Sequence, residues 1–185
     1  MPRPAADPVA DRQDALDACD VLNDFVGDFI TSVMVFREYH GLTQRGKLTL
    51  QMMVPIQKMC LSNILLSLYK LEEFWKRYGR LVPELNVEAG KGLIREINRR
   101  KVAEFRNHYA GHLFHRDTQR PLTTNQIGAA FGLIAPTGAE DFFKWISDPE
   151  AGNPYPSTVV SVCEVLRDAL IAKFQITPEE VMSRA

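Results

Sequence analysis

The chain has 185 residues, of which 45% are hydrophobic and 24% are charged. It is therefore long enough to bury a core, and its composition excludes disordered and fibrous proteins. A formal net charge of −1 and a pI of about 6.4 exclude a globally basic surface, so any nucleic acid or anionic membrane would need a local basic patch. We expect one domain over residues 1–185, with a flexible N-terminus at 1–9 and a short terminal segment at 177–185.

The cysteines and the apolar stretches indicate the compartment. Cys19, Cys60 and Cys163 are odd in number, far apart and surrounded by apolar residues, which predicts reduced, buried thiols in a cytoplasmic protein. The N-terminal residues lack the basic start and apolar stretch of a signal peptide. The longest uncharged apolar-rich stretch, residues 59–69, spans about eleven residues, against roughly 18 or more for a membrane span. We therefore expect a soluble cytoplasmic protein without a membrane partner.

Two long helices are predicted first along the chain. Apolar residues recur with helical spacing from Ala10 to about Tyr39, and the two glycines of residues 41–47 follow. A second helical pattern runs from about Leu50 to Tyr78. Pro55 either occupies the first turn of that helix or kinks it, and Gly79 marks its end.

A third helix is predicted from about Val87 to Leu113, with the sequence FRNHYAGH in its last turns. A polar loop follows, and then two short helices at residues 123–134 and 139–146, the first with Thr124 as a possible N-cap. The proline-rich residues 147–156 are expected to form a loop.

The last segments are also predicted to be helical. The valines of residues 157–174 would suit a strand, but their apolar spacing is closer to 3.6 than to 2. A short terminal helix is expected to begin with Thr177 as its cap and Pro178 at its first position. Because no segment has a convincing strand pattern, the sequence predicts an all-α bundle with two long antiparallel helices, a third motif-bearing helix and shorter C-terminal helices.

The stretch FRNHYAGHLFH, residues 105–115, raises the possibility of a metal site. His108, His112 and His115 are spaced i, i+4, i+7 and would share a helix face. The stretch lacks the glutamate of the H-E-x-x-H motif, and no cysteine or carboxylate cluster nearby offers a convincing further ligand. We therefore expect neither a metal nor another cofactor.

The same region is rich in positive charge. Lys91 to Arg120 contains eight basic and three acidic residues, and such patches bind phosphate polymers by ion pairing. A solvated helix face is the more common explanation of a charge run.

Arg106 and His112 lie about 120° apart around an ideal helix and about 9 Å apart along it. Either both side chains reach one phosphate, or Arg106 pairs with a carbonyl or an acidic neighbour while His112 interacts with the helix dipole.

FRNHYAGH resembles the Arg-x4-6-His signature of the HEPN family (higher eukaryotes and prokaryotes nucleotide-binding domains). It is similar to the variant in which Asn or Asp follows the arginine and the histidine comes six positions after it. Arg106, Asn107 and His112 occupy those positions. The resemblance implies an α-helical bundle that cleaves RNA without a metal, in toxin–antitoxin, abortive-infection or antiviral defence settings. It also implies a homodimer whose two motifs face each other.

The resemblance also implies roles for the residues. His112 would be the general acid or base, Arg106 would stabilise charge on the phosphoryl oxygens, and Asn107 would orient the phosphate or His112. An antitoxin or a nucleotidyltransferase is a possible partner. The alternative is a non-catalytic HEPN-like module that binds RNA, a nucleotide or a partner protein. Candidate RNA-binding residues are Arg95, Arg99, Arg100, His108, Tyr109, His115 and Arg116.

Overall fold

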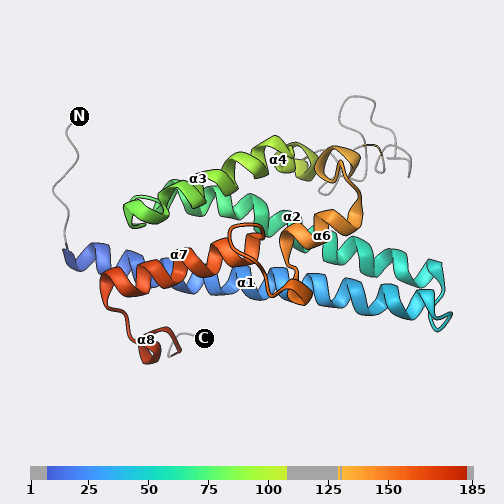
Figure 1. Cartoon of the computed structure of the whole chain (residues 1–185), viewed down its shortest axis with the longest axis horizontal. Coiled ribbons are helices and arrows are strands. Elements are labelled where there is room, and N and C mark those ends of the chain that lie inside the picture. The colour runs from blue at the N-terminus through green and yellow to red at the C-terminus, as the bar shows by residue number, and fades with distance from the viewer. Residues whose placement is uncertain (1–7, 108–128, 130, 183–185) are drawn as a thin grey trace.

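The computed structural model describes residues 8–107, 129 and 131–182, which form an all-α bundle without strands (Figure 1). Within these residues, no helix combines the length and apolar character that crossing a membrane requires. The helices are α1 (Pro8–Gln44), α2 (Leu50–Tyr78), α3 (Glu84–Arg99), α4 (Val102–Phe105), α6 (Ala139–Ile146), the 3-10 helix η2 (Pro149–Ala151), α7 (Val159–Phe174) and α8 (Pro178–Met182).

The two long helices α1 and α2 form the predicted antiparallel hairpin. Phe29 of α1 and Ile64 of α2 are completely buried in the common core. Polar contacts also join the helices: Ser67 donates to Asp28 at 2.7 Å, and Asn63 donates to Ser32 at 3.0 Å. These hydrogen bonds favour one register of the hairpin, because a shift would leave polar groups at the helix interface without partners.

Helix α1 is longer than the sequence predicted at both ends. It begins at Pro8 rather than Ala10, so residues 8 and 9 belong to the helix and not to a flexible N-terminus. At the other end it continues past Tyr39 to Gln44, through Gly41. A glycine inside a helix costs only about 0.5–1 kcal/mol relative to alanine, which the long contact with α2 offsets. Pro55 lies inside α2, and the helix continues through it.

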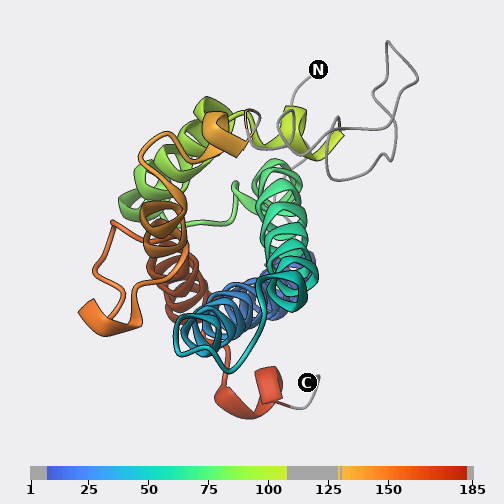
Figure 2. The same ribbon diagram turned by 90° about the vertical axis from the view of Figure 1, so that its right-hand side faces the viewer.

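Helix α7 packs against α1 on the side away from α2, and α3 closes the bundle between α2 and α7 (Figure 2). Residues 157–174, where a strand was the alternative, are helical as predicted from Val159 onward.

All three cysteines are free and buried, as expected. Desolvation by burial raises the pKa of the Cys19 thiol to about 11 and that of Cys163 to about 12. Both thiols therefore stay protonated at neutral pH and are poor nucleophiles.

The predicted continuous third helix is wrong, because the chain breaks between α3 and α4. Lys101 adopts a left-handed conformation with φ of 55°, and α4 starts at the next residue. On an uninterrupted helix, Ile97 and Val102 would point about 140° apart. Both side chains are buried, at 2% and 0% exposure. The break therefore turns Val102 back toward the core that Ile97 already faces.

The C-terminal end is fastened to α1. The Thr177 hydroxyl accepts from the Glu180 backbone N–H at 3.3 Å, and the Glu180 carboxylate accepts from the Thr177 N–H at 2.9 Å, which is a capping box. Arg12 donates to both carboxylate oxygens of Glu180, at 2.8 and 2.9 Å. The predicted cap at Thr177 is thus confirmed. Of the helix expected at 123–134, residues 129 and 131–134 are helical, whereas Thr124 lies outside the described residues.

A close crossing of α2 and α3 gives the first testable prediction. A Cβ atom placed on Gly90 would lie 2.1 Å from the Trp75 ring, whereas one on Gly92 would meet nothing nearer than 3.8 Å. We expect Gly90→Ala to lower the free energy of unfolding by about 1–3 kcal/mol through overpacking. Gly92→Ala, on the same helix, should be neutral or stabilise by about 0.4–1 kcal/mol. Urea denaturation followed by circular dichroism measures both; equal effects would contradict this packing.

Candidate anion-binding site at the end of helix α4

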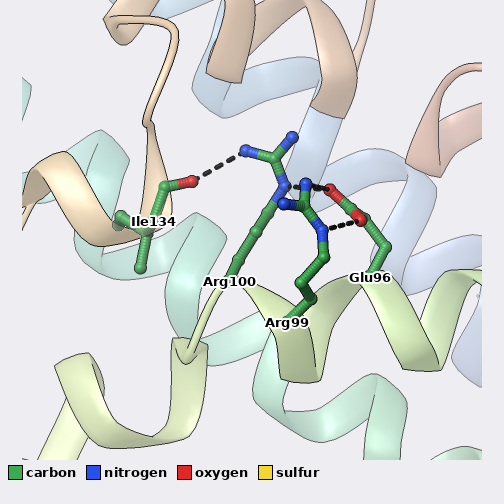
Figure 3. Close-up of polar contacts among 4 residues, drawn as sticks. All are labelled: Glu96, Arg99, Arg100 and Ile134. Atoms are coloured by element: carbon green, nitrogen blue, oxygen red, sulfur yellow. Dashed lines mark hydrogen bonds and ion pairs between the residues drawn. The ribbon is translucent and has the colours of Figure 1, made fainter.

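Arg100 marks the break between α3 and α4 and is held in the interior. Its side chain is only 11% exposed and bonds Glu96 at 2.7 Å. Its Nη1 donates to the backbone carbonyl of Ile134 at 2.7 Å (Figure 3), and its guanidinium stacks over the Trp145 ring at 4.2 Å. Arg100 therefore links α3 to the segment that leads into α6. These contacts leave little guanidinium surface for the RNA-binding role expected from the sequence.

Arg95 and Arg99 are exposed but paired with acids on their own helix. Arg99 donates twice to Glu96, each bond 2.7 Å long, and Arg95 bonds Glu88 at 2.6 Å. The side chains of Arg99 and Arg95 are 64% and 66% exposed. Exposed ion pairs contribute little to stability because water and salt screen them, so an RNA phosphate can compete for either guanidinium. Because these acids neutralise the arginines, the net positive charge on the surface of α3 is smaller than the count of its basic residues indicated.

Arg106 differs from these three arginines because its partners among the described residues are all neutral. Its guanidinium lies over the Tyr69 ring of α2 at 4.6 Å, and its Nη1 donates to the Asn107 side-chain oxygen at 3.0 Å. Among the described residues, no carboxylate forms an ion pair with it. A half-buried guanidinium that no described carboxylate neutralises is suited to attract an anion, and its planar donors match the oxygens of a phosphate.

The backbone also changes at this point. The Arg106 N–H bonds the carbonyls of Ala103 and Val102, and Arg106 and Asn107 adopt the wider π-helical geometry. Such wide turns often occur at functional sites. Here the turn follows directly on the buried side chain of Phe105, so the two polar side chains are presented at the end of a helix that is anchored in the core.

The remaining motif residues belong to the part of the chain that the structure does not describe. His108, Tyr109, His112, His115 and Arg116 are all in it, so the proximity of His112 to Arg106 stays a prediction. In the part that is described, no group of three or more His, Cys, Asp or Glu residues could hold a metal ion. The three histidines that raised that possibility are not in this part.

Sequence reasoning missed Tyr69. It lies 37 positions before Arg106 on a different helix, and no local pattern links the two residues. The aromatic side chain expected near the motif was Tyr109, whereas the described ring against Arg106 comes from α2. A cation–π contact with a tyrosine contributes about 0.5–2 kcal/mol. Tyr69 therefore helps to hold the Arg106 guanidinium in one position without neutralising its charge.

A concave surface lies along α3, away from Arg106. A cavity of about 460 Å³ opens between α3 and the residues before α7, with Trp145, Tyr155 and Leu93 in its walls. The charged pair Glu88 and Arg95 also lines it, and these two side chains bond each other. Because these charged groups are already paired, the end of α4 is the better candidate for binding an anion.

The fold and this site define an all-α helical bundle with an uncompensated arginine, among the described residues, at a helix end. No protein-family model and no curated protein matches the chain. Among solved structures, it is similar to the integron cassette protein Vpc_cass2 from the mobile metagenome of V. paracholerae. The two share 23% sequence identity with a TM-score of 0.69, over 84% of this chain and 95% of that one. At this identity the similarity shows a common fold alone.

The ion pair between Glu96 and Arg100 can be tested through the pH dependence of stability. Hydrogen bonding from Arg99, followed by that from Arg100, lowers the pKa of Glu96 below its ordinary 4.5. A lowered folded-state pKa contributes stability that is present above pH 4.5 and is lost as the pH falls through the folded-state value. We expect Glu96→Gln to be less stable than the unmodified chain at about pH 7, with the difference shrinking in acid. Thermal melts from neutral pH down to about pH 3 measure this.

Glu104→Gln is the matched control, because Glu104 is 52% exposed and pairs only with Lys101, at 3.5 Å, among the described residues. It should change stability little at any pH. An equal loss of stability in both variants, or a loss in Glu96→Gln that does not depend on pH, would contradict a structural role for the Glu96 and Arg100 pair.

Proposed function

We propose that the chain is a metal-independent endoribonuclease of the HEPN type, acting in a toxin or anti-phage defence setting. The observation that carries the proposal is the state of Arg106. It occupies the arginine position of the motif, and it is the arginine of residues 95–106 whose charge no described carboxylate compensates. A purely structural arginine would have contacts like those of Arg100.

The chemistry follows from the groups of the motif. His112 removes the proton of a ribose 2′-hydroxyl, whose oxygen bonds to phosphorus while the bond from phosphorus to the 5′-oxygen breaks. The departing 5′-oxygen takes a proton from water, and His112 releases its proton to the solvent, so the products end in a cyclic phosphate and a free 5′-hydroxyl. Arg106 stabilises the charge that grows on the non-bridging oxygens, and the Asn107 amide donates to the same phosphate.

Contacts outside the motif are expected to be few. Arg95 and Arg99 can release their acids to bind flanking phosphates, since both ion pairs are exposed. Arg100 is left out of the RNA contact because its guanidinium is already engaged. A protein that contacts few phosphates loses affinity only gradually with salt. This fits an acidic pI better than a broad electrostatic surface would.

RNA cleavage in EDTA tests the proposal. The purified chain should cut a labelled RNA of mixed sequence, and His112→Ala should slow cleavage by roughly 10²–10⁴-fold, the usual contribution of a general acid or base. Arg106→Ala should slow it by roughly 10²–10³-fold, the usual contribution of one charge-stabilising donor. Gel electrophoresis of the products, with a phosphatase and kinase assay of their ends, measures rate and chemistry together.

Arg77→Ala is the matched control, since Arg77 also lies over a tyrosine ring, at 5.0 Å from that of Tyr78, but is outside the motif. Its variant should cleave at the unmodified rate. Failure to cut any RNA, or cleavage that Arg106→Ala and His112→Ala leave unchanged, would overturn the proposal. RNA binding without turnover, weakened by Arg106→Ala, would support the non-catalytic alternative instead.

A further inference from the structure

The cavity along α3 has walls that are mainly apolar. Helices α3 and α7 lie side by side on one side of the bundle (Figure 2). Leu93 of α3 and Val162 of α7 line the cavity and are 7% and 3% exposed. Trp145 of α6 and Tyr155, which precedes α7, add two aromatic rings. A concave site of about 460 Å³ with such walls and a few polar groups has the size and composition of a small-molecule site.

The α3 wall of this cavity is bare at Gly92. Glu88, Gly92 and Arg95 are spaced i, i+4 and i+7, so they share one face of α3. A Cβ atom placed on Gly92 would lie 3.8 Å from Nη2 of Arg95. The Arg95 guanidinium therefore folds back over a position that has no side chain of its own. Once that guanidinium swings away, a ligand can approach the helix backbone closely.

An ion pair between Glu88 and Arg95 closes the space above Gly92. Glu88 Oε1 and Arg95 Nη2 are 2.6 Å apart, and the two side chains are 73% and 66% exposed. Seven residues span about 10.5 Å along a helix, so both side chains bend toward each other to meet. Because water screens an exposed pair, opening it costs little free energy. The two opened side chains would present opposite charges on either side of Gly92.

The third charged residue of the cavity lining is already engaged. The Glu96 carboxylate accepts hydrogen bonds from two arginines. One of them, Arg100, also covers the Trp145 ring, so that ring is already in contact with a cation. Among the described residues that line the cavity, Glu88 and Arg95 are therefore the charges that a ligand can recruit.

We propose that this cavity binds a free amino acid that has a large apolar side chain. The ligand carboxylate takes the place of Glu88 on the planar donors of Arg95, and the ligand ammonium takes the place of Arg95 at Glu88. One ion pair within the protein is thus exchanged for two with the ligand. A ligand with a single charge forms one new pair and leaves one protein charge without a partner. The apolar side chain of the ligand contacts Trp145 and Leu93.

This inference does not depend on the proposed function. The cavity residues lie outside the Arg-x4-6-His motif, and binding of an amino acid is measured without RNA. A chain that binds the amino acid and cuts no RNA would refute the proposed function alone. A chain that cuts RNA and binds no amino acid would refute the present proposal alone.

Three related compounds test the requirement for both charges. L-Phenylalanine has both, 3-phenylpropanoate lacks the ammonium, and 2-phenylethylamine lacks the carboxylate. In isothermal titration calorimetry with the full chain, L-phenylalanine should bind saturably, and each analogue should bind at least about tenfold more weakly. Glycine, which has no side chain to fill the cavity, should show no measurable binding. Equal affinity of L-phenylalanine and either analogue would overturn the proposal, as would an absence of binding by L-phenylalanine, L-leucine and L-tryptophan alike.

Variants of the cavity show where the amino acid binds. Glu88→Gln and Arg95→Gln should each weaken binding at least about tenfold, and Gly92→Leu, which fills the bare position, should abolish it. Arg45→Gln is the matched control, because Arg45 is 56% exposed and pairs with Glu38 at 3.7 Å on α1; this variant should bind normally. Circular dichroism checks that each variant is folded. A folded Gly92→Leu variant with unchanged affinity would contradict binding in this cavity.

Discussion

The contacts of Arg100 determine where the candidate site lies. One guanidinium bonds a carboxylate on α3, bonds the backbone carbonyl of Ile134 and stacks on Trp145. It thereby holds three parts of the chain together at the residue where α3 ends. Because Lys101 then turns left-handed, α4 turns Val102 and Phe105 into the core and delivers Arg106 to the Tyr69 ring. The position of the motif arginine is a consequence of this break.

Pairing, rather than the number of basic residues, distinguishes Arg106 from the three arginines that precede it at positions 95, 99 and 100. Arg95, Arg99 and Arg100 all have carboxylate partners, whereas the described partners of Arg106 are an aromatic ring and an amide. Replacing the carboxylate of an exposed ion pair by a phosphate costs little free energy, as for Arg95 and Arg99, whereas breaking the buried pair of Arg100 costs much more. Arg106 can bind a phosphate without breaking an ion pair to any described acid. The comparison of these four arginines by their carboxylate partners therefore predicts a small phosphate site at the end of α4 instead of a basic groove along α3.

The long elements were predictable because their signals are local. The 3.6-residue period of α2 predicts the observed bounds, and Thr177 predicts its cap from its own residue type. The ion pairs of Glu96 with Arg99 and Arg100 were also accessible, since they are spaced i, i+3 and i, i+4. The break at Lys101 was not, because nothing within α3 indicates that Arg100 bonds residue 134. The contact of Tyr69 with Arg106 was equally inaccessible, since it depends on how two helices cross.

The proposed function places the RNA-cleaving site between the two chains of a homodimer. The most direct measurement is the cleavage rate of a purified heterodimer that carries Arg106→Ala in one chain and His112→Ala in the other. One arginine and one histidine then remain on opposite chains. We expect this heterodimer to cut RNA well above the rate of either variant homodimer. A heterodimer as inactive as both homodimers would contradict a site shared between two chains.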